Sequence, residues 1–157
     1  MSIRLAGGSQ GPRRDDRGSA LVEVTWLAVL LLVPLVYLVL AVFEVQRAAF
    51  ALSAATRAAG RAYTLAPSQA AAEQHARSAA SVALADQGLE LARGSLDVRC
   101  EPDPGRCLSP GSVVLVRMVY PVRLPLVPDA LGGDGAPSLR LNAEHSVPYG
   151  TFREARP

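Results

Sequence analysis

The hydrophobic pattern of the chain is dominated by one uncharged apolar run, residues 24–43. About 20 residues at a rise of ~1.5 Å cover roughly 30 Å, the thickness of the hydrocarbon core of a bilayer. The run therefore predicts a transmembrane helix. Pro34 lies inside it and removes one backbone donor, a change that a membrane helix absorbs as a kink. Because no second long apolar run follows, we expect a single crossing.

The helical pattern continues beyond this run in an amphipathic segment, residues 44–66. Its apolar positions recur every three or four residues and so share one face: Ala48, Ala49, Leu52, Ala55, Ala59, Ala62 and Tyr63. The opposite face carries Arg47, Arg57 and Arg61. Phe50 falls on this arginine side, either as an exposed aromatic or as a contact with another subunit. We expect one helix from Val24 to about Ala66, because the residue before Pro67 is pushed out of the helical region.

A second helix is expected after Pro67, with Ser68 as its N-cap, and running to about Gln87. Gly88 follows, and glycine suits the left-handed position after a helix. One side of this helix carries small residues: Ala72, Ala76, Ala79 and Ala83. Small side chains let helices approach closely, so we expect an alanine-lined hairpin of two helices.

After Arg93-Gly94 the apolar period changes from about 3.6 to 2, which predicts β-strands. Three segments alternate in this way: residues 96–100, 114–124 and 139–147. Strands with one apolar face imply a small three-stranded antiparallel sheet that the helices cover. Pro121 and Pro125 place the later part of the middle strand at an edge or beyond the pairing. The expected fold class is α+β, with residues 129–137 as a glycine-rich loop.

A polar leader meets the apolar run at residues 18–23, Gly-Ser-Ala-Leu-Val-Glu. A carboxylate at the mouth of a membrane span must be neutralised, hydrated or paired, so Glu23 needs an explanation. The stretch resembles the processing site of type IV pilin-like subunits, in which a glycine precedes the cut and the fifth mature residue is glutamate. That resemblance implies cleavage after Gly18 by a prepilin peptidase. It also implies a free α-amino group at Ser19 that pairs with Glu23 of a neighbouring copy.

Two other interpretations of the N-terminal segment remain open. A cleavable secretory signal would use the small residues of Ala49-Phe50-Ala51, and a plain anchor would not be cleaved. The secretory interpretation is disfavoured because the apolar run exceeds the usual length of about 7–15 residues. It is also disfavoured because a signal sequence gains nothing from Glu23.

Charge and cysteines indicate the side of the membrane on which each part lies. The arginines near the span are Arg4, Arg13, Arg14 and Arg17 before it, and Arg47, Arg57 and Arg61 after it. This distribution only leans toward a cytoplasmic N-terminus. Cys100 and Cys107 are the only cysteines, and their closeness in sequence predicts a disulfide in an oxidising compartment. We therefore place the leader in the cytoplasm and the C-terminal domain outside.

The chain as a whole resembles the TadE-like family of pilus-assembly proteins, which are minor pilin-like subunits of tight-adherence (Flp-type) pilus systems. Residues 18–24, Pro34 and the alanine-rich block over residues 54–62 carry this likeness. The remainder resembles the family in layout only. The resemblance implies a minor pilin, or pseudopilin, that is a substrate of a prepilin peptidase. Its implied partners are other pilin-like subunits, the Tad/Flp assembly machinery and membrane lipid.

The sequence has little sign of metal binding, phosphate binding or catalysis. His75 and His145 are not placed with the two cysteines at zinc-ligand spacing, so no metal site is predicted. The glycine-rich residues 132–135 lack the lysine and hydroxyl residue of a phosphate loop. No nucleophile motif surrounds any serine, so we expect neither catalysis nor a cofactor. The net charge of +2 is too small to imply a nucleic-acid partner.

The expected organisation has four parts. Residues 1–18 form a leader peptide, residues 19–66 a long helix, residues 67–149 an extracytoplasmic helix and sheet, and residues 150–157 a tail. Two functions are compatible with this organisation. One is a processed subunit that takes part in assembly of a surface pilus. The other is a monomeric, single-pass, membrane-anchored binding module outside the cytoplasm.

Overall fold

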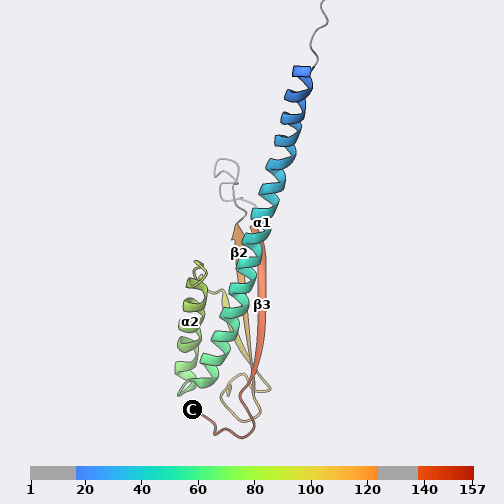
Figure 1. Ribbon diagram of the computed structural model, residues 1–157. Coiled ribbons are helices and arrows are strands. Elements are labelled where there is room, and N and C mark those ends of the chain that lie inside the picture. Colours follow the sequence, from blue (N-terminus) through green and yellow to red (C-terminus); the bar gives the residue numbers. More distant parts are fainter. Residues whose placement is uncertain (1–16, 124–137) are drawn as a thin grey trace, which may run out of the picture. The chain divides into compact units, whose positions relative to one another are not determined.

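The computed structural model describes residues 17–123 and 138–157, and in these ranges it contains two helices and a three-stranded antiparallel sheet (Figure 1). The elements are α1 (Arg17–Leu65), α2 (Gln69–Ala85), β1 (Leu96–Glu101), β2 (Val113–Arg123) and β3 (Ser138–Pro148). The predicted α+β fold class is thus confirmed. The chain divides into two compact units, Met1–Leu38 and Val39–Pro157, and α1 runs through the boundary.

Helix α1 begins at Arg17 rather than at Val24, so the helix includes the backbone of the expected processing site. Among residues 17–23, only Gly18 is a poor helix former, and the apolar residues that follow it favour helix. The helix ends at Leu65, close to the predicted end before Pro67. The nearby Pro67 accounts for this helix end, because a proline disfavours helical backbone angles in the residue before it.

Helix α2 begins as predicted. The side chain of Ser68 accepts a hydrogen bond from the backbone N–H of Ala71 at 3.3 Å, as an N-cap does. Gly88 has a φ of 70° and lies just past the helix end, where a left-handed residue is needed. The buried side of α2 is formed by Ala72, Ala76, Ala80 and Leu84.

The buried face of α1 differs from the predicted face at Ala49 and, to a smaller extent, at Ala62, which is only half-buried. Ala48, Leu52 and Ala55 are buried as expected, but Ala49 is exposed and Ala51 is buried instead. Successive helical residues are rotated by about 100°, so Ala49 turns to the flank while Ala51 stays near the core. The predicted opposite face is exposed: Arg47, Arg57, Arg61 and Phe50.

The strands are ordered β1-β2-β3, so β2 is central. Along β2 the backbone N–H and C=O groups of successive residues point alternately to one neighbouring strand and to the other. Two hydrogen bonds show which residues face which strand: Val119 N–H donates to Ser95 O, and Tyr149 N–H donates to Ser112 O. Odd-numbered residues of β2 direct their backbone polar groups toward β1, and even-numbered residues direct theirs toward β3.

This alternation explains how β2 accommodates Pro121. The strand pairs with β1 only as far as Met118, whereas Pro121 pairs with Arg140 of β3. The N–H that proline lacks would point to the side where β1 has already ended, so no ladder bond is lost. The prediction that Pro121 occupies an edge position is confirmed, and Pro125 lies outside the described residues.

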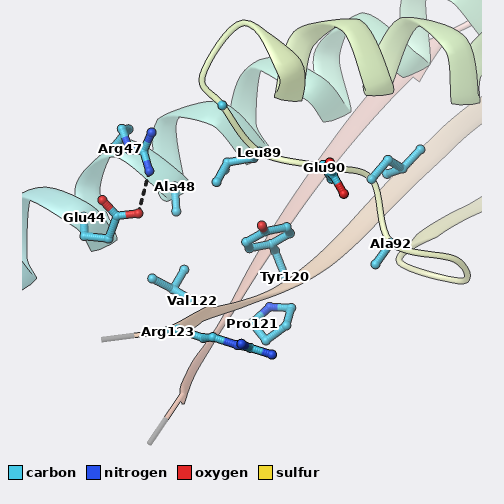
Figure 2. A pocket seen from close by; sticks show the side chains of 12 residues that line it. Glu44, Arg47, Ala48, Leu89, Glu90, Ala92, Tyr120, Pro121, Val122 and Arg123 are labelled. Atoms are coloured by element: carbon cyan, nitrogen blue, oxygen red, sulfur yellow. Dashed lines mark hydrogen bonds and ion pairs between the residues drawn. The ribbon is translucent and has the colours of Figure 1, made fainter. Parts of the chain in front are cut away.

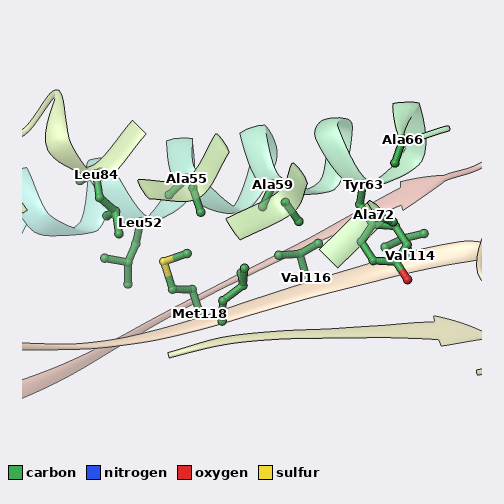
Figure 3. Packing of buried hydrophobic residues seen from close by; sticks show 14 of the residues in the cluster. Leu52, Ala55, Ala59, Tyr63, Ala66, Ala72, Leu84, Val114, Val116 and Met118 are labelled. Atoms are coloured by element: carbon green, nitrogen blue, oxygen red, sulfur yellow. The ribbon is translucent and has the colours of Figure 1, made fainter. Parts of the chain in front are cut away.

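The core lies between the helices and one face of the sheet (Figure 3). Leu52, Ala55 and Ala59 of α1 face Val116 and Met118 of β2 in this view. The helix approaches the sheet closely at Gly60, where an added Cβ would lie 2.6 Å from Cγ2 of Val147 and 3.5 Å from Cγ2 of Val116. Gly60 is therefore required by packing rather than by backbone conformation.

This contact predicts that Gly60→Ala destabilises the domain. Alanine in place of glycine ordinarily stabilises a helix by about 0.5–1 kcal/mol, but a methyl group at this position overpacks the core, which costs about 1–3 kcal/mol. We expect a net loss on the order of 1 kcal/mol in thermal unfolding of the full chain in detergent. In a Val147→Ala background, which removes the colliding methyl, the same substitution should become stabilising. An increase in stability from Gly60→Ala alone would contradict the close contact.

Candidate functional site

The described residues contain one helix with the length and apolar character to cross a membrane, over Val22–Leu65. In its most apolar 18-residue window, only 6% of the residues are buried by the rest of the protein. A core helix of a soluble protein would be largely covered, whereas these side chains lie open. The exposed positions include Trp26, Leu30 and Phe43. This segment therefore needs a lipid or protein environment to cover it.

Glu23 lies near the N-terminal end of this apolar surface. Its side chain is exposed, and it borders a shallow depression that Trp26, Leu27 and Leu30 also line. The four residues have the i, i+3, i+4 and i+7 spacing of a single helix face. Gly18 and Ser19 lie in the first turn of α1, so the predicted scissile bond and Glu23 belong to one continuous helix.

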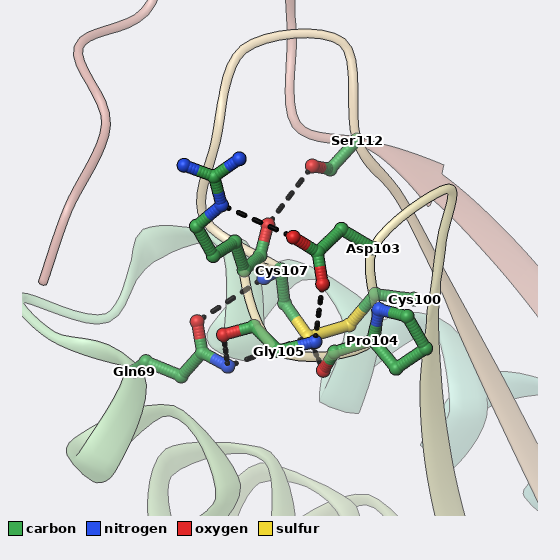
Figure 4. Close-up of a disulfide and its surroundings, with 8 residues drawn as sticks. Gln69, Cys100, Asp103, Pro104, Gly105, Cys107 and Ser112 are labelled. Atoms are coloured by element: carbon green, nitrogen blue, oxygen red, sulfur yellow. Dashed lines mark hydrogen bonds and ion pairs between the residues drawn. A yellow bond between two sulfur atoms is a disulfide. The ribbon is translucent and has the colours of Figure 1, made fainter.

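The two cysteines are bonded to each other, as predicted (Figure 4). Their Cα atoms are 5.3 Å apart, and the bond closes the loop between β1 and β2. Gln69 holds this loop against the first turn of α2, because its side-chain amide donates to Gly105 O at 3.0 Å and accepts from Cys107 N–H at 3.1 Å. The disulfide therefore links the sheet to the start of α2 through Gln69.

Sequence reasoning missed Gln69, although its position directly after the N-cap Ser68 was a usable signal. Side chains in the first helical turn are near the unpaired backbone groups of that turn and point toward neighbouring loops. The Cys100–Cys107 loop is also braced internally. Asp103 accepts a hydrogen bond from Gly105 N–H at 2.9 Å and pairs with Arg106 at 3.1 Å, and these contacts lower the pKa of its carboxyl, the bond from Gly105 contributing most.

The C-terminal tail is packed on the helices rather than extended away from them. Arg156 donates to the backbone oxygens of Leu65 and Ala66, at 3.1 and 2.6 Å, and Arg153 donates to Thr64 O at 3.2 Å. The carbonyls of Thr64 and Leu65 are the last two of α1 and have no partner within the helix, and that of Ala66 follows directly after the helix end. Arg153 also stacks on the ring of Tyr149, 4.9 Å from its centroid. The tail thus caps the C-terminal end of α1.

A cavity of about 510 Å³ lies in the Val39–Pro157 unit, between residues 44–48 of α1, the loop after α2 and the end of β2 (Figure 2). Arg47 spans one wall, pairing with Glu44 at 2.6 Å and donating to Gln87 O at 2.7 Å. Glu90, Tyr120 and Arg123 line the opposite parts. Two acids and two arginines balance each other, so the cavity has no strong charge preference.

The described ranges hold no group of three or more histidine, cysteine, aspartate or glutamate side chains that would bind a metal ion. His75 is exposed on α2, and His145 is half-buried on β3, opposite Val116. Burial raises the pKa of Tyr63, and the charge of Glu73 raises it further.

Comparison with other proteins adds nothing to this geometry, since no family model, curated protein or solved structure matches the chain. The site residues fall into two groups. Gly18, Ser19 and Glu23 lie on the N-terminal part of α1, and Cys100 and Cys107 lie in the second unit. The features from which a function can be inferred are therefore the exposed apolar part of α1 and the acid near its N-terminal end, Glu23.

The disulfide predicts that neither cysteine of the native protein reacts with an alkylating reagent unless a reductant is added. Because Cys100 and Cys107 are the only cysteines, any labelling of the unreduced chain would reveal an open pair. Replacing both with serine should lower the free energy of unfolding by roughly 2 kcal/mol, since the bond restricts a short loop in the unfolded chain. Thermal unfolding of the two forms in detergent measures the difference.

Proposed function

We propose that this protein is a TadE-like minor pilin that acts in assembly of a Flp/Tad-type surface pilus. The observation that carries the proposal is Glu23, an exposed carboxylate at the entrance of an exposed apolar helix. An ionised acid at this position is costly in lipid unless it is hydrated or paired. A function that requires a partner for the acid explains its presence, whereas simple anchoring does not.

Helix geometry supports the pairing. Ser19 and Glu23 are four residues apart in α1, which corresponds to about 6 Å along the axis. A parallel copy of α1 displaced by about one turn would bring the α-amino group of its Ser19 level with Glu23 of the first copy. The amino group exists only after cleavage behind Gly18. Processing would therefore create the partner of the acid, and assembly would follow processing.

In this proposal the leader lies in the cytoplasm and the Val39–Pro157 unit lies outside. A membrane prepilin peptidase removes the leader, and the mature helix remains in the bilayer until partner subunits cover it. The disulfide supports an oxidising location for the second unit, because such bonds persist outside the reducing cytoplasm. The other pilin-like subunits supply the surface that replaces lipid around α1.

A second candidate is a monomeric, membrane-anchored binding module. The cavity beside Arg47 and Tyr120 favours it, because its volume suits a small ligand. The charges that line this cavity balance each other and its walls are open, so its lining does not indicate which class of ligand would bind. The two candidates differ in one measurable property, since a binding module needs neither cleavage after Gly18 nor other pilin-like subunits.

The first prediction from this function concerns processing. The mature chain should begin at Ser19, because glycine offers the peptidase a small residue before the cut. Replacing Gly18 with leucine should leave the leader attached, whereas the same change at Gly11, within the leader, should not. Mass spectrometry of the intact protein from cells that contain the peptidase measures the start. A wild-type chain that still begins at Met1, or one that begins near Leu52, would contradict the proposal.

The second prediction concerns Glu23. Glu23→Ala should leave membrane insertion and cleavage intact but reduce recovery of partner pilins by at least about tenfold, since loss of a charge pair in an apolar setting costs more than 1.4 kcal/mol. Glu23→Gln should be intermediate, because it keeps hydrogen bonding and loses the charge. The measurement is co-purification of tagged protein with partner subunits from membranes.

A matched control is Glu44→Ala. Glu44 is also an acid of α1, but it is paired with Arg47 within the chain, so its loss should not change recovery of partners. Equal recovery with Glu23→Ala and wild type would remove the assembly role of this carboxylate and favour the plain anchor.

A further inference from the structure

The outer edge of β3 has backbone groups without a partner in the described structure. β3 pairs with β2 alone, and the alternation of the ladder turns the N–H and C=O groups of its even-numbered residues away from β2. These residues are Ser138, Arg140, Asn142, Glu144 and Ser146, and all are exposed. A free edge of this length is a template for another strand.

Membrane anchoring restricts which strand can bind there. α1 and β3 run in the same direction, because residues 44–48 share a cavity with Arg123, which pairs with Ser138, and Gly60 meets Val147 at the other end of β3. A two-fold antiparallel pair of β3 strands would therefore point the packed parts of the two α1 helices, residues 39–65, in opposite directions. The Val39 ends of these parts, which lead to the proposed anchors, would then lie at opposite ends of the pair, and such a pair does not suit two chains anchored in one membrane, as the proposed function requires.

The other free edge of the sheet, that of β1, can pair with β3 of another copy without reversing the direction of α1. β1 is antiparallel to β2 and so runs in the same direction as β3. Its even-numbered residues Leu96, Val98 and Cys100 turn their backbone groups away from β2. Parallel pairing of β3 with β1 of another copy keeps both α1 helices in one direction and matches donors with acceptors. It also places the helices of both copies on the same face of a continuous sheet.

Charge selects the register of this pairing. Aligning Glu144 with Arg99 of a second copy places Asn142 opposite Asp97 and Ser146 opposite Glu101, so no like charges meet. Moving the second copy by two residues in one direction sets Glu144 opposite Asp97, which is also an acid. Moving it in the other direction sets Glu144 opposite Glu101 and Arg140 opposite Asp97, so attraction and repulsion cancel there, whereas the proposed register has attraction alone. Like charges directly opposite each other destabilise a strand pair, whereas opposite charges stabilise it. The charges that protect an isolated edge thus favour one register.

We propose that the β3 edge binds the β1 edge of a second copy of this chain, in parallel, with Glu144 opposite Arg99. The inner face of β3 supports the pairing, because Leu139 is 47% exposed and Leu141 and Ala143 are only half-buried. α2 of the second copy, which lies over its own sheet, would cover these side chains. The interface joins two different surfaces and repeats without closing, as the interfaces of filaments do.

Cysteine cross-linking in membranes tests the proposal with the full chain. Opposed residues of neighbouring strands lie about 4.8 Å apart, within the range of roughly 4.4–6.8 Å that a disulfide spans. Asn142→Cys and Asp97→Cys are introduced into separately tagged copies and expressed together. We expect a disulfide-linked heterodimer from the mixture and no dimer from either variant alone. A dimer from Asn142→Cys alone would indicate a two-fold pair of β3 strands and would overturn the proposal.

Charge reversal then tests the register. Adding Glu144→Arg to the Asn142→Cys copy should lower the yield of heterodimer at least fivefold, and adding Arg99→Glu to the Asp97→Cys copy should restore it. Arg61→Glu, an exposed substitution on α1, serves as the control and should change nothing. Absence of cross-linking between copies that reach the membrane with the native disulfide intact would reject the pairing. Because this readout does not depend on Glu23 or on cleavage after Gly18, it separates failure of the pairing from failure of the proposed function.

Discussion

The close contact between α1 and the sheet at Gly60 is the constraint on which the rest of the domain depends. The helix backbone approaches Val116 and Val147 so closely that a single methyl group would collide with Val147. Small residues on the same face, including Ala55 and Ala59, keep the separation low along the helix. A sheet of three strands has little apolar area, so it depends on a closely packed helix to exclude water from its inner face.

The end of this helical layer at which α1 ends and α2 begins is held by polar contacts that do not involve the core. Arg153 and Arg156 satisfy the last carbonyls of α1, and Gln69 joins the start of α2 to the disulfide loop. Each contact pairs backbone groups that a helix end or a loop leaves open. The helices and sheet are therefore connected through the tail and the Cys100–Cys107 loop as well as through apolar packing.

In the proposed function, the two parts of α1 lie in different environments. Its N-terminal part has exposed apolar side chains suited to lipid or to other helices, and its C-terminal part buries an alanine face on the sheet and exposes arginines. The boundary between the two units lies within α1, which is continuous in sequence and in secondary structure there. The proposed pairing of Glu23 would act in the first unit, and the proposed pairing of sheet edges would act in the second.

The sequence by itself determined the features that local rules control. The apolar length of the span, the N-cap at Ser68, the alternation of the strands and the proximity of Cys100 to Cys107 all depend on neighbours along the chain, so pattern and spacing predicted them. The tertiary structure decided what depends on distant segments. It placed Gly60 against Val147, brought Gln69 to the disulfide loop, and showed that the missing N–H of Pro121 faces the side where β1 has ended. Strand order, register and helix rotation set these contacts, and no local spacing encodes them because each joins residues that become neighbours only after folding.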